Sequence, residues 1–182
     1  MAHVFAFEDL RGQPLAEVRK IIGSKAANLA EMANELGLPV PPGFAVSTAA
    51  CLQYLAHGWP EGLEEELRAH MARVEAVLRR RFGDPADPLL VSVRSGAPVS
   101  MPGMMDTLLN VGLNSATSDG LARQSGDPAF VEACRSRLAK SYPDIVGIPV
   151  PDDPWQQLRG AVEAVFRSWN SERARAYRKR EN

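Results

Sequence analysis

Apolar residues recur along the chain in two patterns, which predict short strands and amphipathic helices. Short runs rich in β-branched or aromatic residues predict strands at residues 4–7, 44–47 and 89–93. Between the first two runs, apolar residues lie three or four positions apart, which is the spacing of one helix face. These residues are Ile22, Ala26, Leu29, Ala33 and Leu36, followed by Gly37 as a stop signal. The chain therefore begins with a predicted strand, helix and strand.

Longer amphipathic patterns follow. Residues 61–82 predict a helix with an apolar stripe at Leu63, Leu67, Met71, Val74 and Leu78. We interpret the acidic triplet at residues 64–66 as a solvated helix face rather than a metal site. After Asn114, Phe130, Cys134 and Leu138 indicate one helix, and Trp155, Leu158, Val162, Val165 and Trp169 indicate another. We therefore expect a mixed α+β part at residues 1–113 and a helical part at residues 114–182.

Composition narrows the class of protein. The 182 residues are 45% hydrophobic, which is enough to fill a core, and 21 Lys and Arg balance 22 Asp and Glu. The net charge of -1 gives no long-range field that would draw the chain to nucleic acid or anionic membrane. No apolar run is long enough for a membrane span, and residues 1–10 lack a basic signal-peptide start. We expect a cytoplasmic protein that binds neither nucleic acid nor membrane.

The most unusual segment is VSVRSGAPVSMPGMMDTLLNVGLN, residues 91–114. A predicted strand ends at Arg94 and is followed by small, turn-forming residues that include Gly96 and Gly103. Arg94 offers a planar, permanently charged fork suited to phosphate oxygens, and glycines let backbone approach a ligand closely. The alternative is an ordinary surface loop in which Arg94 forms a salt bridge.

A second candidate is GSKAANLAEM, residues 23–32, in which Gly23 and Ser24 open a helix and place Lys25 in its first turn. A helix N-terminus favours anions, and a lysine there would reinforce such a site. The segment is not a Walker A loop, because Val18 stands where the first glycine is needed and Ala26 follows the lysine. The alternative is a lysine that faces solvent.

Together these segments resemble the pyruvate, phosphate dikinase family and, more distantly, phosphoenolpyruvate synthases. The resemblance is carried by residues 23–48, 81–114 and 120–130, with a weaker match at residues 165–179, in collinear order over nearly the whole chain. It implies the first lobe of an ATP-grasp nucleotide-binding domain with an appended helical subdomain. It also implies that Lys25 and Arg94 contact ATP phosphates. A loop at residues 100–107 would cover the nucleotide with Gly103, Met104, Met105 and Thr107.

The resemblance also sets expectations for activity. In this family a phosphoryl group passes from ATP to a histidine of another domain and then to pyruvate, which forms phosphoenolpyruvate. No segment of this chain matches that histidine motif, the pyruvate-binding barrel or the second lobe with its magnesium ligands. We therefore expect no catalytic or metal-ligating residue here, weak binding of ATP with Mg²⁺, no turnover by the isolated chain, and a monomer. Whether this chain acts as an enzyme stays open.

Two further points stay open. The family usually has glycine where this chain has Ser24 and Ala26, and a positive φ at either position would be strained. An alternative function is a non-catalytic module that docks onto a full-length or separately encoded dikinase. Met101, Met104 and Met105 would then lie exposed on its interface.

Overall fold

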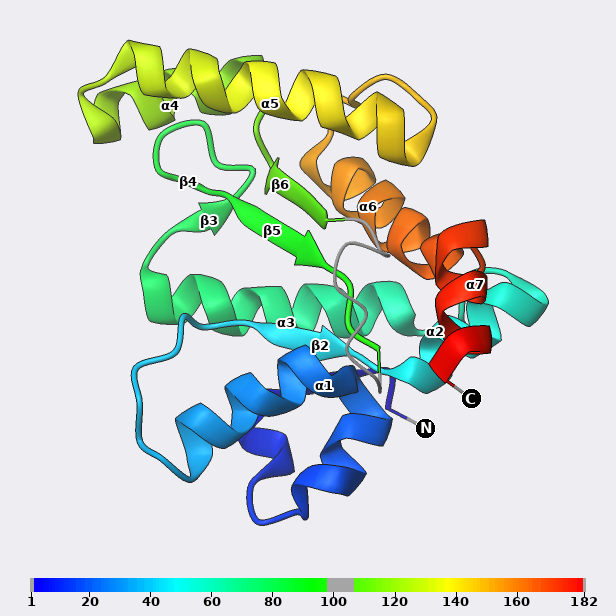
Figure 1. Ribbon diagram of the computed structural model, residues 1–182. Helices are drawn as coiled ribbons and strands as arrows, with labels where there is room; N and C mark the ends of the chain where they lie inside the picture. The colour runs from blue at the N-terminus through cyan, green and yellow to red at the C-terminus, as the bar shows by residue number, and fades with distance from the viewer. Residues whose placement is uncertain (1, 98–106, 182) are drawn as a thin grey trace. The chain divides into compact units, whose positions relative to one another are not determined.

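The computed structural model describes residues 2–97 and 107–181 (Figure 1). The chain divides into two compact units. The first unit comprises residues 1–78 with 96–102, and the second comprises residues 79–95 with 103–182. Both units combine helices with two-stranded sheets, so the predicted mixture of α and β structure is confirmed.

The first unit places one small sheet against helices. Its elements are β1 (Val4–Ala6), the 3-10 helix η1 (Phe7–Leu10), α1 (Leu15–Asn34), β2 (Phe44–Val46), α2 (Thr48–His57) and α3 (Leu63–Leu78). Strands β1 and β2 are antiparallel, with Val4 opposite Val46. Four of the five residues of the predicted α3 stripe are buried, namely Leu63, Leu67, Met71 and Val74, whereas Leu78 at the end of the helix is 40% exposed.

The described residues of the second unit form two small sheets and four helices. Its elements are β3 (Arg81–Phe82), β4 (Pro88–Leu89), β5 (Val91–Arg94), β6 (Thr107–Val111), α4 (Ser115–Ser125), α5 (Pro128–Val146), α6 (Pro154–Ser168) and α7 (Glu172–Glu181). Strands β3 and β4 are parallel, and β5 and β6 are antiparallel. Helices α5 and α6 both pack against β6. Asp127 and Asp153 cap the N-termini of α5 and α6, each just before a proline at the first helical position.

Several boundaries differ from the sequence-based expectation. The helix predicted at residues 61–82 ends at Leu78, because Arg79 takes a φ of 55° and the next residues pair in β3. The predicted strand at residues 89–93 is divided between β4 and β5. Helices α2 and α4 were not predicted. The division at residues 113/114 stays a prediction, and the compact units do not follow it, since β3 to β6 pack with the C-terminal helices.

Candidate functional site

Helix α1 is interrupted at Gly23, directly before the predicted phosphate-binding lysine. Gly23 has φ 78° and ψ 162°, which are not helical values, and regular helix resumes at Ser24. A second helix N-terminus therefore lies inside α1, and Lys25 occupies its first turn with an exposed side chain. The prediction that Gly23 and Ser24 open a helix is confirmed, although another helical stretch, starting at Leu15, precedes the break.

Ser24 and Ala26, which stand where the family usually has glycine, do not strain the backbone. The positive φ falls on Gly23, which the chain retains. Among the described residues other than glycine, positive φ occurs at Arg79 and Asn110 and not at Ser24 or Ala26. The second helical stretch can therefore start here without glycine at either replaced position.

Arg94 and Thr107 are brought together in the second unit. Arg94 is the last residue of β5 and lies opposite Thr107, the first residue of β6, and both are exposed. Within the described part of the chain, no carboxylate pairs with Arg94 or with Lys25, so the alternative of an ordinary Arg94 salt bridge finds no partner there. Gly103, Met104 and Met105 lie outside the described residues, as does Met101.

The segment after Arg94 contacts the break in α1 through backbone atoms. The amide of Ser24 donates a hydrogen bond to the carbonyl oxygen of Ala97 over 2.8 Å. A Cβ placed on Gly23 would lie 2.8 Å from the carbonyl carbon of Gly96. The sequence suggested that Gly96 admits a ligand, whereas in the structure it admits the backbone of Gly23.

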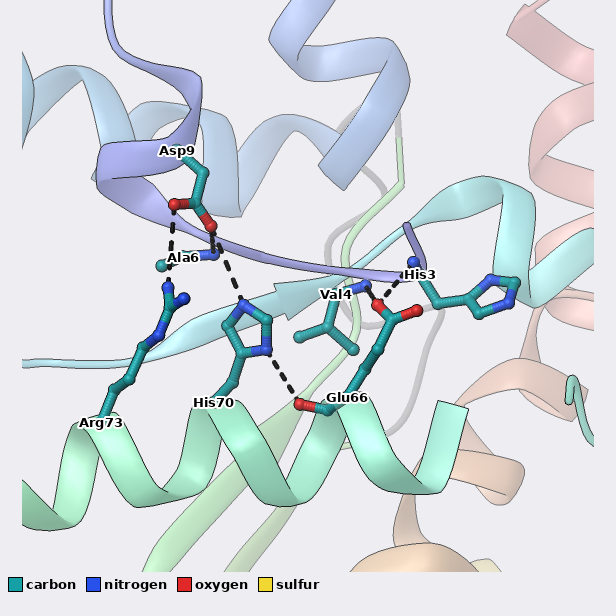
Figure 2. Close-up of polar contacts among 7 residues, drawn as sticks. All are labelled: His3, Val4, Ala6, Asp9, Glu66, His70 and Arg73. Atoms are coloured by element: carbon teal, nitrogen blue, oxygen red, sulfur yellow. Dashed lines mark hydrogen bonds and ion pairs between the residues drawn. The ribbon is translucent and has the colours of Figure 1, made fainter. Parts of the chain in front are cut away.

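A second polar cluster lies where α3 faces β1 and η1, all within the first unit (Figure 2). Glu66 accepts hydrogen bonds from the amides of His3 and Val4 through one carboxylate oxygen, at 2.7 and 2.8 Å. Asp9 accepts from the Ala6 amide over 2.9 Å. Glu66 therefore has a structural function that the interpretation of residues 64–66 as a solvated face missed.

The same cluster contains a histidine and an arginine beside Asp9. His70 Nδ1 lies 2.8 Å from the Glu66 carbonyl oxygen, and its Nε2 lies 3.8 Å from an Asp9 oxygen. Arg73 approaches the other Asp9 oxygen at 3.7 Å. Figure 2 shows the His70 and Arg73 side chains reaching from α3 toward Asp9 on η1.

A pocket of about 350 Å³ opens beside this cluster. His70, Arg73, Arg11 and Glu8 contribute to its lining together with apolar residues such as Phe44. The acidic Glu8 lines the same pocket as the two arginines, and Arg73 is already paired with Asp9. The pocket therefore lacks the concentration of unpaired cations that a triphosphate needs.

The part of the chain that the structure describes contains neither a candidate metal site nor a membrane-spanning helix. Within residues 2–97 and 107–181, no three His, Cys, Asp or Glu side chains come together as ligands for a metal ion. No helix in the same ranges has the length and apolar character needed to cross a bilayer.

Comparison with known proteins gives one consistent family. Residues 19–61 and 60–182 match the family described as pyruvate phosphate dikinase, AMP/ATP-binding domain. The chain is 40% identical to pyruvate, phosphate dikinase of Rhizobium meliloti (strain 1021) and 41% identical to the chloroplastic pyruvate, phosphate dikinase 1 of Oryza sativa subsp. japonica, over 96% of its length in both cases. Identity to the Clostridium symbiosum pyruvate, phosphate dikinase is 36% over 90% of the chain.

The match covers a limited part of these relatives. The aligned region makes up 25%, 23% and 24% of the three relatives in the same order, so the chain spans about a quarter of their length. The alignment with the Rhizobium meliloti relative runs over 224 residues, whereas this chain has 182. That relative therefore contains internal residues that this chain lacks.

Proposed function

The chain belongs to the pyruvate phosphate dikinase AMP/ATP-binding domain family, and from this membership we propose that it binds ATP through Lys25 and Arg94. The observation that carries the proposal is the break at Gly23, which gives Lys25 a place in the first turn of a new helical stretch. A cation there opposes the helix dipole at a cost of about 0.3–1 kcal/mol. A bound phosphate would offset that cost, because it attracts both the lysine and the helix N-terminus.

Arg94 supplies the second cationic contact in this proposal. Its exposed guanidinium at the end of β5 has no ion-pair partner among the described residues and can offer two parallel N–H groups to phosphate oxygens. Thr107, opposite Arg94 in the β5/β6 ladder, would add a hydroxyl donor. Gly103, Met104 and Met105 complete the proposed nucleotide contacts, as the family resemblance implies.

We also propose that the chain contributes the first ATP-grasp lobe and a helical subdomain to a dikinase-type reaction. In that reaction a phosphoryl group moves from ATP to a histidine and then to pyruvate. These 182 residues would bind and orient ATP, since phosphoryl transfer depends mainly on positioning and on neutralising charge. The transfers to the histidine and to pyruvate would take place in regions that correspond to the parts of the relatives outside the aligned segment. The protein ligands for Mg²⁺ would belong to the second ATP-grasp lobe, as the family resemblance implies.

Calorimetric titration with magnesium ATP tests this function. Lys25→Ala and Arg94→Ala should each weaken binding by roughly 10- to 100-fold, because a hydrogen bond to a charged group contributes about 1.5–3 kcal/mol. Lys20→Ala is the matched control for Lys25, since Lys20 lies on α1 before the break and pairs with Glu17 at 2.8 Å. Arg135→Ala, at an exposed position on α5, is the control for Arg94. Equal affinities in all five proteins would contradict the proposal.

A further inference from the structure

Gly23 and Gly96 touch each other through their backbones, although 72 residues separate them along the chain. Both residues belong to the first compact unit. A Cβ on Gly23 would meet the Gly96 carbonyl carbon at 2.8 Å and the Ala97 nitrogen at 3.0 Å. A Cβ on Gly96 would meet the Ile22 carbonyl oxygen at 3.3 Å. A Cβ on Gly23 would therefore force the two backbone segments apart, whereas a Cβ on Gly96 would require a shift of only a few tenths of an ångström.

Gly23 also needs to be glycine for its conformation. Its φ of 78° and ψ of 162° lie in a region that is essentially restricted to glycine. This conformation interrupts α1 and exposes the amides of the next residues, which would otherwise bond to carbonyls of the preceding turn. Ala97 accepts from the first of these, the Ser24 amide, over 2.8 Å.

The hydrogen bond from Ser24 to Ala97 limits which backbone amides near Lys25 can bind a ligand. The Ser24 amide is occupied by Ala97, which is itself buried with 8% exposure. Phosphate would therefore contact the Lys25 side chain and the later amides of the turn rather than the Ser24 amide. The Gly23–Gly96 contact lies two residues along the chain from Lys25 on one side and from Arg94 on the other.

We propose that Gly23 and Gly96 are positioning residues for ATP: their contact holds the first turn around Lys25 against residues 96–97. This inference rests on the function proposed above and extends it to two residues that do not touch the nucleotide. ATP affinity should then depend on glycine at positions 23 and 96 as well as on the two cationic side chains of Lys25 and Arg94.

The test combines magnesium ATP titration with amide hydrogen exchange of Ser24 measured by NMR. Gly23→Ala and the milder Gly96→Ala should each weaken ATP binding at least 10-fold and accelerate Ser24 exchange at least 10-fold. Gly12→Ala is the matched control for Gly23, because Gly12 has φ 75° and no atom within 4 Å of an added Cβ. Gly43→Ala controls for Gly96, since an added Cβ there meets only the Phe7 ring, at 4.0 Å. Both controls should keep wild-type affinity and exchange.

The outcomes separate this inference from the proposed function. If wild type binds ATP and both glycine variants bind it equally well, the positioning role is wrong and the proposed function stands. If Ser24 exchange in Gly96→Ala stays at the wild-type rate, the contact does not hold this turn and the inference is again overturned. If wild type itself has no affinity for ATP, the proposed function fails and the positioning role fails with it. Lys25→Ala should weaken ATP binding while Ser24 exchange stays slow, which distinguishes the loss of a contact from the loss of positioning.

Discussion

The side chain of Gln157 accepts a hydrogen bond from the amide of Gly112 over 2.9 Å, and the glutamine is fully buried. Its Nε2 donates to the carbonyl oxygens of Leu113 and Pro151 at 3.1 and 2.7 Å. One α6 side chain thus satisfies backbone groups after β6 and in the turn before α6. Buried backbone groups left without a partner are costly, so this glutamine should matter to the stability of the second unit.

Replacing Gln157 should therefore destabilise the fold strongly. Gln157→Ala leaves one amide and two carbonyls without their partner, and we expect a loss of about 3 kcal/mol in the free energy of unfolding. For a chain of this size, that corresponds to a fall of roughly 6–12 °C in Tm. Thermal unfolding followed by circular dichroism measures it. The exposed neighbour Gln156→Ala is the control, and a similar Tm for the two variants would contradict this assignment.

Glu66 should stabilise the first unit in a way that its acidic neighbours do not. Its carboxylate accepts two backbone amides from the start of the chain, at His3 and Val4. A hydrogen bond to a charged group is stronger than one between neutral groups. Glu66→Ala should therefore lower the free energy of unfolding by about 2 kcal/mol. Glu65→Ala removes an exposed carboxylate one residue away and should change stability by less than about 0.5 kcal/mol. Urea unfolding of both variants measures these changes. Equal midpoints for the two variants would show that the Glu66 carboxylate adds no stability through the His3 and Val4 amides.

Tyr142 should make stability fall at alkaline pH. Burial, and secondly the Glu163 carboxylate, raise the pKa of the Tyr142 phenol from 10.0 to about 12. Below pH 10 the phenol is protonated in both the folded and the unfolded state, and it makes its full contribution to the stability of the fold. Between pH 10 and 12 the unfolded state ionises first, so the folded state loses stability.

The comparison with Tyr142→Phe isolates this effect. The phenol donates a hydrogen bond to the Gln157 carbonyl over 3.2 Å, so the variant should be less stable by about 1 kcal/mol at pH 8. That difference should shrink by about 1 kcal/mol at pH 11, because one unit of pKa is equivalent to about 1.4 kcal/mol. Urea unfolding at pH 8, 9, 10 and 11 measures both proteins. A difference that stays constant with pH would mean that the phenol ionises equally in the two states.

The sequence predicted those parts of the structure that depend on local pattern. The apolar stripe of α3 and the helix start beside Lys25 follow from residue spacing and from a glycine next to a serine. The end of α3 at Leu78 did not, because it depends on the left-handed turn at Arg79 and on the pairing of β3 with β4. A left-handed conformation is uncommon for residues other than glycine, so an arginine at position 79 does not predict that turn.

Contacts between distant segments could not be predicted in this way. Gly96 was correctly singled out as a place of close approach, but its partner is the Gly23 backbone, and no pattern in the sequence joins the two. Glu66 looked like its neighbours in an acidic triplet, and only packing of α3 beside β1 brings it to the His3 and Val4 amides. Helices α2 and α4 were missed although Ser47 and Asn114 cap them, since neither has an apolar stripe: α2 buries Ala50, and Leu121 is the one large apolar residue buried in α4.

An NMR titration of the isotope-labelled chain with magnesium ATP tests most directly whether Lys25 and Arg94 bind the nucleotide. If they do, the amide signals of residues 24–27 and 94–97 shift together and saturate with one dissociation constant. Signals of residues that line the pocket beside His70 should stay in place. Shifts confined to that pocket, or no shift at any position at millimolar ATP, would contradict the claim that Lys25 and Arg94 bind the nucleotide.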